Sequence, residues 1–181
     1  TSMVYILLAP GFEEAEALVP VDMLRRANIE TATVSITGEP VPGSHGVTVL
    51  ADVTLDDVDL SKADMIVLPG GGPGYKNLGK EPKVEQLVRG AAEKGLWIAA
   101  ICAAPTLLGR WGLLEGKNAV CYPGMEEGLT GAQPRMDQGF VVDGKIITGR
   151  AAGSAFDFGL TLVEVLAGAA EADKVRHGIY Y

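Results

Sequence analysis

The chain has 181 residues, of which 48% are hydrophobic and 21% are charged, a composition typical of globular proteins. Its net charge is −8 and it has no basic run, so we do not expect it to bind nucleic acid. No apolar stretch reaches the length of a membrane span, which takes roughly 18 residues or more. Two cysteines are too few for a disulfide framework, and they favour a reducing, cytoplasmic setting.

We expect residues 1–181 to form a single domain, since a chain of this length supports one hydrophobic core. Thr1 and Ser2 precede Met3, a plausible initiator, and we interpret them as a remnant of cloning. No secretory signal peptide is recognisable in the sequence.

The predicted elements alternate between buried strands and helices. In chain order, the sequence predicts a strand at 3–9, a helix at 12–28, strands at 31–36, 46–52 and 63–71, a helix at 82–95, a strand at 96–101, a short helix at 102–112, a weaker strand at 118–122, a hairpin at 139–149 and a helix at 154–168. The 46–52 strand need not join the main sheet. Pro20 interrupts the first helix, so we expect a kink or a freed carbonyl at Glu16.

This alternation predicts an α/β fold, a doubly wound parallel sheet sandwiched by helices, with a small β-hairpin. Periodicity does not choose between the flavodoxin-like and Rossmann strand orders. In such sheets, ligands bind beyond the carboxyl ends of the strands. Three stretches should meet at that edge: residues 11–16, 69–74 and 102–105.

Cys102 lies where a buried strand meets a helix, in the stretch AAICAAPT. A free cysteine is often simply a packed, small apolar residue. Its position, however, is that of a nucleophile elbow, where a strand–turn–helix exposes the reactive side chain. The positive end of a helix dipole favours the thiolate there. The sequence by itself leaves both interpretations open.

The glycine-rich stretch LPGGGPG at 68–74 lacks the spacing and the lysine of a phosphate-binding loop. It could be a flexible turn, or it could present backbone N–H groups to an anion, since glycine permits close approach. If these amides face Cys102, they form an oxyanion-type site.

Three acids, Glu13, Glu14 and Glu16, begin the first helix. Acids at a helix start usually complement the helix dipole, but this start shares the predicted site edge with Cys102. A carboxyl that faces a thiol would either hold a proton or take one, and the residues do not say which acid points inward. No cluster has metal-ligand spacing, and no Cys–His pair is readable, so we expect neither a metal nor a cofactor.

Four motifs together resemble the ThiJ/PfpI superfamily, in the branch that holds the human parkinsonism-associated deglycase and the bacterial chaperone YajL. They are APGFEEAEALVPVDMLRRA at 9–27, VLPGGGPG at 67–74, AAICAAPTLL at 99–108 and TGRAAGSAFDFGL at 148–160. The resemblance implies a flavodoxin-like fold and a homodimer in which residues 14–28 lie near the two-fold axis.

The resemblance also assigns roles to single residues. It implies that Cys102 is the reactive cysteine and that Glu16 is the acid bonded to its sulfur. It places the backbone N–H groups of Gly71 and Ala103, with Gly70 beside them, around a bound oxygen. Further residues would border the site or the partner subunit: Arg26, His45, Tyr122 and Arg150.

Two positions distinguish this chain within the family. Relatives of the peptidase type have a histidine directly after the cysteine, whereas this chain has Ala103, which disfavours peptidase activity. Several members of the branch carry a histidine in the stretch that matches VCYPG, where this chain has Tyr122. Tyrosine, with a pKa of about 10, is a poor base near neutrality.

Two functional hypotheses follow. The first is a cysteine-dependent glyoxalase or deglycase that acts on small reactive aldehydes such as methylglyoxal, or on early glycation adducts. The alternative is an oxidative-stress sensor or holdase chaperone with little turnover, whose cysteine is oxidised to a sulfinate.

Overall fold

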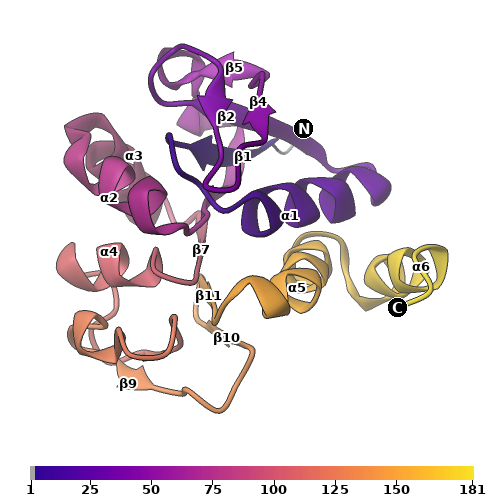
Figure 1. Ribbon diagram of the computed structural model, residues 1–181. Helices are drawn as coiled ribbons and strands as arrows, with labels where there is room; N and C mark the ends of the chain where they lie inside the picture. The colour runs from indigo at the N-terminus through magenta and orange to yellow at the C-terminus, as the bar shows by residue number, and fades with distance from the viewer. Residues whose placement is uncertain (1–2) are drawn as a thin grey trace.

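The computed structural model describes residues 3–181, so the interpretation of Thr1 and Ser2 lies outside the described residues. A central sheet separates two groups of helices, with α2, α3 and α4 on one side and α1, α5 and α6 on the other (Figure 1). Within residues 3–181, no helix is both long enough and apolar enough to cross a membrane.

The main sheet has seven strands in the order β10-β11-β7-β6-β1-β2-β5. Their bounds are Met3–Leu8 for β1, Glu30–Ser35 for β2, Val53–Thr54 for β5, Ala63–Leu68 for β6, Trp97–Ile101 for β7, Phe140–Asp143 for β10 and Ile146–Gly149 for β11. Every neighbouring pair is parallel except β10 with β11. The parallel strands β2, β1, β6, β7 and β11 therefore follow the flavodoxin-like order, which periodicity could not distinguish from the Rossmann order.

The helices are α1 (Glu14–Arg26), α2 (Gly72–Lys80), α3 (Pro82–Glu93), α4 (Pro105–Arg110), α5 (Ala155–Ala167) and α6 (Ala169–Gly178). Strand β1 shows why both faces of the sheet need cover, because its side chains alternate between the two cores. Tyr5 and Leu7 pack into the core under α3, whereas Val4 and Ile6 pack into the core under α1 and α5. The doubly wound α/β sandwich predicted from the sequence is confirmed.

Two small sheets lie outside the main one. Strands β3 (Val41–Pro42) and β4 (Thr48–Val49) form an antiparallel pair, so the strand predicted at 46–52 indeed stays outside the main sheet. Strands β8 (Asn118–Ala119) and β9 (Gln133–Pro134) form a short parallel pair. The structure also contains short 3-10 helices at Leu55–Asp57, Leu60–Lys62, Glu126–Gly128 and Ala152–Ser154.

Several boundaries differ from the predictions. The strand predicted at 118–122 has only two strand residues, and the helix predicted at 102–112 begins at Pro105, because 102–104 form the turn. The predicted 139–149 hairpin forms, but its second strand joins the main sheet beside β7. Helix α1 continues through Pro20.

Helices α2 and α6 were not predicted. The α2 sequence, GPGYKNLGK, is poor in helix-forming residues, and its helix depends on tertiary packing. Leu78 is buried, and Gly74 approaches Phe12 so closely that an added Cβ would lie 2.7 Å from the Phe12 Cα. Of the glycine-rich stretch 68–74, only residues 72–74 are helical, and residues 69–71 form the connection between β6 and α2.

Candidate functional site

The turn after β7 holds Cys102 in a left-handed backbone conformation, with φ +68°. This conformation is unfavourable for a residue with a Cβ, so the surrounding structure must hold it in place. The Cys102 N–H donates to the Gly149 carbonyl at 2.9 Å, and the Tyr122 N–H donates to the Cys102 carbonyl at 2.8 Å. The thiol is half-buried, and the turn has the strand-to-helix geometry of a nucleophile elbow.

Gly149, at the end of β11, supports this elbow and was not singled out from the sequence. An added Cβ there would lie 2.9 Å from Ile101 Cγ1 and 2.9 Å from Phe158 Cδ1. Glycine at this position lets β11 lie close to β7, so that the Gly149 carbonyl can accept the Cys102 N–H. A glycine at the end of the predicted 139–149 hairpin was the one available signal.

Glu16 projects from the first turn of α1 into the same edge of the sheet and is only 1% exposed. Its Oε1 accepts the Gly70 N–H at 3.0 Å, and both this oxygen and the Cys102 Cβ lie within 2.6 Å of the place that a Gly70 Cβ would take, so the carboxyl and the thiol are neighbours. Of the three acids at the start of α1, Glu16 is therefore the one next to the sulfur.

Gly70 and Gly71 lie between α1 and the elbow. A Cβ at Gly70 would lie 2.5 Å from Glu16 Oε1 and 2.6 Å from Cys102 Cβ, so glycine is required there. The Gly70 N–H was expected to be an oxyanion donor, but it is occupied by Glu16 and instead orients the acid.

The backbone N–H groups of Gly71 and Ala103 interact with the Cys102 sulfur and lower the pKa of the thiol. Gly71 has φ +100°, and a Cβ there would lie 2.6 Å from the Glu13 backbone nitrogen. Two amides thus point at the sulfur, which is the arrangement that stabilises an anion at that place.

The electrostatics of the pair differ from the sequence prediction of a thiolate favoured by a helix dipole. Burial, followed by the charge of Glu16 and the hydrogen bond to it, raises the pKa of Cys102 to about 12, although the two amides lower it. Burial and the charge of Glu13 raise the pKa of Glu16 to about 7, although the hydrogen bonds from Cys102 and Gly70 lower it. The α4 dipole has little effect because that helix is short and begins only at Pro105.

These two shifts are those of one coupled pair, which keeps a single proton over a wide pH range. The charge of Glu16 raises the pKa of Cys102 only while Glu16 is ionised. When Glu16 carries the proton, that repulsion disappears and the N–H groups of Gly71 and Ala103 favour a sulfur anion.

Glu13, Glu14 and His45 form a second cluster beside the pair, where the β3–β4 hairpin meets α1. The His45 Nδ1 lies 3.2 Å from Glu14 Oε1 and 3.5 Å from Glu13 Oε1. Glu14 also accepts the backbone N–H groups of His45 and Val47, which lower its pKa to about 2 despite burial.

Metal-ligating atoms of this cluster lie within 4.8 Å of one another, a grouping that sequence spacing did not reveal. The Glu14 oxygens are already taken by the hairpin donors, so Glu14 acts as an anchor of the hairpin rather than as a free ligand.

The remaining predicted border residues are placed differently. The Tyr122 side chain is 49% exposed, and its backbone contacts Cys102 directly. Arg26 is on the exposed face of α1, paired with Asp22 at 2.9 Å, and Arg150 donates to the Met136 carbonyl at 3.1 Å. Within this single chain, neither arginine is hydrogen-bonded to the Cys102–Glu16 pair.

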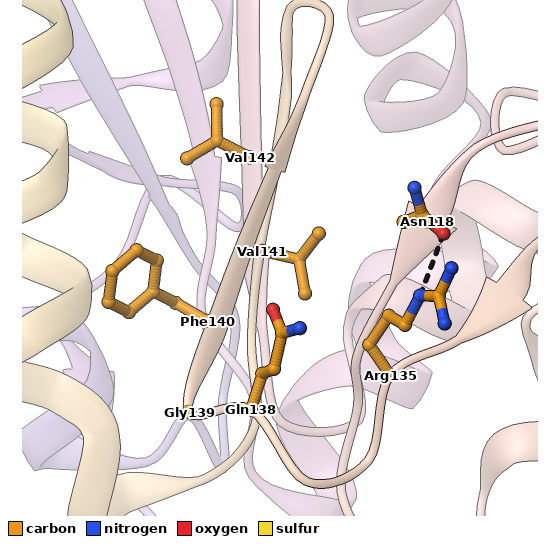
Figure 2. A pocket seen from close by; sticks show the side chains of 7 residues that line it. All are labelled: Asn118, Arg135, Gln138, Gly139, Phe140, Val141 and Val142. Carbon is orange, nitrogen blue, oxygen red and sulfur yellow. Dashed lines mark hydrogen bonds between the residues drawn. The ribbon is translucent and has the colours of Figure 1, made fainter.

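A separate cavity of about 690 Å³ borders strand β10 (Figure 2). In Figure 2, Val141 and the Asn118–Arg135 hydrogen bond, 2.8 Å long, face each other across it. Its lining residues are Asn118, Arg135, Gln138, Gly139, Phe140, Val141 and Val142. None of these belongs to the Cys102–Glu16 pair or donates to it, so this cavity is not part of the candidate active site.

Fold and site together define a class of protein: a flavodoxin-like α/β fold that presents a cysteine at a strand-to-helix elbow beside a buried carboxyl. The sequence model of the DJ-1/PfpI family matches residues 2–165. The chain belongs to the DJ-1/PfpI family, as its motifs predicted.

Individual relatives agree with this assignment. Protein DJ-1 homolog B of Arabidopsis thaliana is 40% identical over 177 residues, which are 97% of this chain but only 40% of that protein. The chain therefore spans less than half the length of that relative. The Caenorhabditis elegans protein named glutathione-independent glyoxalase DJR-1.2 is 34% identical over 164 residues, 90% of this chain and 88% of that protein.

Among solved structures, that of Drosophila melanogaster DJ-1beta is similar with a TM-score of 0.95 and 38% sequence identity. The match covers 99% of this chain and 98% of that one. The family includes a protein named as a glyoxalase.

Proposed function

We propose that the protein is a cysteine-dependent glyoxalase or deglycase that converts small reactive carbonyls, with Cys102 as the nucleophile. The observation that carries this proposal is the position of the buried Glu16 carboxyl beside the Cys102 side chain, with the N–H groups of Gly71 and Ala103 lowering the pKa of that thiol. The name of the Caenorhabditis elegans relative supports the same substrate class.

The reaction with methylglyoxal would begin with the sulfur anion of Cys102 and the proton on Glu16. The sulfur adds to the aldehyde carbon, and the new oxyanion takes a proton from Glu16, which gives a hemithioacetal. The N–H groups of Gly71 and Ala103 stabilise the negative charge as it develops.

Glu16, now a carboxylate, removes the hydrogen from the former aldehyde carbon, and the resulting enediol takes a proton back at the neighbouring carbon. The first carbon is thereby oxidised and the second reduced, so no external redox partner is needed. Water then cleaves the resulting thioester, which releases lactate and the Cys102 thiol. An acid with a pKa of about 7 suits both donation and removal of a proton near neutral pH.

The test is lactate formation from methylglyoxal by the wild type and by Cys102→Ala. We expect the wild type to form lactate and the variant to form none above the uncatalysed rate. Equal rates in the two proteins would rule out Cys102 as the nucleophile. A glycated amine as substrate, with release of the free amine as the readout, separates deglycase from glyoxalase activity.

A second candidate function is a redox sensor or stress chaperone with little turnover. The same two amides and the same acid would hold a sulfinate, formed from the thiolate and two molecules of peroxide with release of two molecules of water. The absence of a histidine at Tyr122 favours this alternative, since a tyrosine does not accept protons well near neutrality. Intact mass after mild peroxide treatment tests it: two added oxygens, absent in Cys102→Ala, are expected.

We also propose that the protein is a cytoplasmic homodimer, as the family resemblance implies. Exposed apolar side chains near α1 support an interface there. Leu50, after β4, is 82% exposed, Val47 is 50% exposed, and Phe156 on α5, which packs against α1, is 47% exposed.

A further inference from the structure

Strand β10 forms one edge of the main sheet and is paired on one side only, with β11. The Gly139 carbonyl accepts the Arg150 N–H at 2.9 Å, so these two residues, which continue the register of the strands, are a hydrogen-bonded pair. Bonded and non-bonded pairs alternate along an antiparallel ladder, so the backbone of Val141 also faces β11. The N–H and C=O groups of Phe140 and Val142 therefore point away from β11, at the open edge of the sheet.

This edge lacks the usual protection against pairing with another chain. Natural edge strands are commonly very short, or they carry a lysine or a proline. Strand β5, at the opposite edge, has only two residues, whereas β10 has four and contains neither lysine nor proline. The side chains of Phe140 and Val142 are partly exposed, at 36% and 42%. Within this chain, the β10 edge is therefore available to an additional strand.

The cavity of about 690 Å³ beside β10 has a cationic wall, formed by Arg135. The Arg135 Nε donates to Asn118 Oδ1 at 2.8 Å, and none of the ion pairs within residues 3–181 includes Arg135. In Figure 2 the Val141 side chain points toward Arg135, whereas the Phe140 side chain points to the other side of the strand. The groove therefore combines main-chain donors and acceptors, apolar side chains and a positive charge that no carboxylate of the described residues neutralises.

We propose that the β10 edge is a docking site for an extended segment of a partner protein, which adds to the sheet as an antiparallel strand and carries an acidic residue between two apolar ones. Opposite residues of an antiparallel pair lie on the same face of the sheet. The acidic side chain, opposite Val141, lies on the side of Arg135, and its apolar neighbours lie beside Phe140 and Val142. In this mode of binding, main-chain hydrogen bonds supply affinity and the alternate side chains supply specificity.

A second copy of β10 fits this edge less well, because it does not bring an acid to Arg135. The strand has the sequence FVVD, and its only acid is Asp143. The Asp143 carboxylate already accepts the Asn118 backbone N–H at 2.8 Å, which ties β8 to β10. The charge of Arg135 therefore favours a different, acidic chain.

The first test uses the acetylated and amidated peptide Thr-Val-Glu-Val-Thr, titrated into the isotope-labelled full chain and followed by NMR. Saturable shifts of the Phe140 and Val142 amide signals are expected. In the antiparallel arrangement both valine N–H groups of the peptide point to β10, and the glutamate N–H points away. N-methylation of either valine should therefore abolish binding, whereas N-methylation of the glutamate should not. Binding that tolerates N-methylation of both valines would overturn the proposal.

The second test addresses the charge. Arg135→Gln should weaken binding of this peptide about fivefold, the size of one exposed ion pair, and should not change binding of the matched peptide Thr-Val-Gln-Val-Thr. Arg89→Gln, which removes an exposed arginine from α3, should match the wild type. If Arg135→Gln binds both peptides as tightly as the wild type does, Arg135 does not recognise the acid and the proposal fails.

Val142→Pro removes an N–H that the fold does not use, so it should abolish binding of both peptides while circular dichroism stays unchanged. If the wild type without peptide forms assemblies that Val142→Pro dissociates, β10 pairs with a second copy and the proposal is overturned. The docking site is independent of the methylglyoxal assay, because Cys102→Ala should bind the peptide as the wild type does.

Discussion

The Glu16 carboxyl, from the first turn of α1, lies beside the Cys102 side chain, from the turn after β7, at the carboxyl edge of the sheet. Neither group has its ordinary proton affinity there, because burial raises the pKa of both. The behaviour of the site with pH is therefore a property of the pair, and several predictions can be derived from it.

The rate of lactate formation should rise with pH through about 7. Below the Glu16 pKa of about 7 both groups are protonated and the sulfur is a neutral thiol, whereas above it the pair has lost one proton and carries the reactive charge. A pH profile of kcat/KM for methylglyoxal measures this. Glu16→Gln should lose the inflection and reduce kcat/KM by roughly 100-fold or more, the usual contribution of a general acid–base. A wild-type profile that is flat from pH 5 to 9 would contradict the assignment.

The free energy of unfolding should fall as pH rises through the pKa of Glu16, whereas the rate of lactate formation should increase. A carboxyl whose folded pKa is raised from 4.5 to about 7 binds its proton more tightly in the native state. Its contribution to stability is therefore complete below pH 4.5 and is lost as pH rises to about 7, by up to about 3 kcal/mol.

Denaturant unfolding at several pH values tests this linkage. The free energy of unfolding of Glu16→Gln, minus that of the wild type, should increase as pH rises from 4.5 to 7, because the amide cannot ionise. If this difference does not change with pH, Glu16 has an ordinary pKa in the folded protein.

Gly70→Ala should strongly reduce lactate formation without unfolding the protein. The new Cβ would lie 2.5 Å from Glu16 Oε1 and 2.6 Å from Cys102 Cβ, so the acid and the sulfur would have to move apart. A misplacement of this size can cost about 100-fold in rate. The control is Gly72→Ala in the same glycine run, where an added Cβ meets no atom within 4 Å. Assays and circular dichroism of both variants are needed, and equal activities would argue against close contact at Gly70.

The chain should sediment as a dimer at micromolar concentration, and Leu50→Glu should weaken that dimer by at least about tenfold, as expected when an apolar interface residue becomes charged. Val142→Glu is the matched control, because Val142 is 42% exposed but lies on β10, at the other edge of the sheet. A wild-type monomer at that concentration, or equal effects of the two variants, would contradict an interface near α1.

Hydrophobic patterning predicted the strands that matter most for the site. The continuous apolar runs around β1, β6 and β7 reflect burial on both faces, and the carboxyl ends of these strands bring Glu16, Gly70 and Cys102 together. Patterning alone left open which of the three acids faces the thiol, because that depends on the rotation of α1 against the sheet. The family resemblance supplied Glu16 for that role.

Other features could not be predicted from the local sequence, because they depend on tertiary contacts. Helix α2 contains three glycines and a proline and forms because Gly74 and Leu78 pack against the rest of the protein. The pKa of Cys102 was expected to be low because of a helix dipole, and burial beside an acid reverses that direction. One buried oxygen of Glu13 has no hydrogen-bond partner within residues 3–181, and it lies where α1 meets a hairpin more than 30 residues away, as the Glu14 contacts to His45 and Val47 show.

The left-handed turn at Cys102 is held by the backbone of its neighbours: its N–H is bound by Gly149 and its carbonyl by Tyr122. The shape of the elbow therefore does not depend on sulfur. A protein lacking the thiol should keep the same architecture, so a sulfur-free variant is a true chemical knockout rather than a misfolded one. The scaffold and the reactive atom are thus separable, and the residue at position 102 could change its chemistry while the fold around it stays the same.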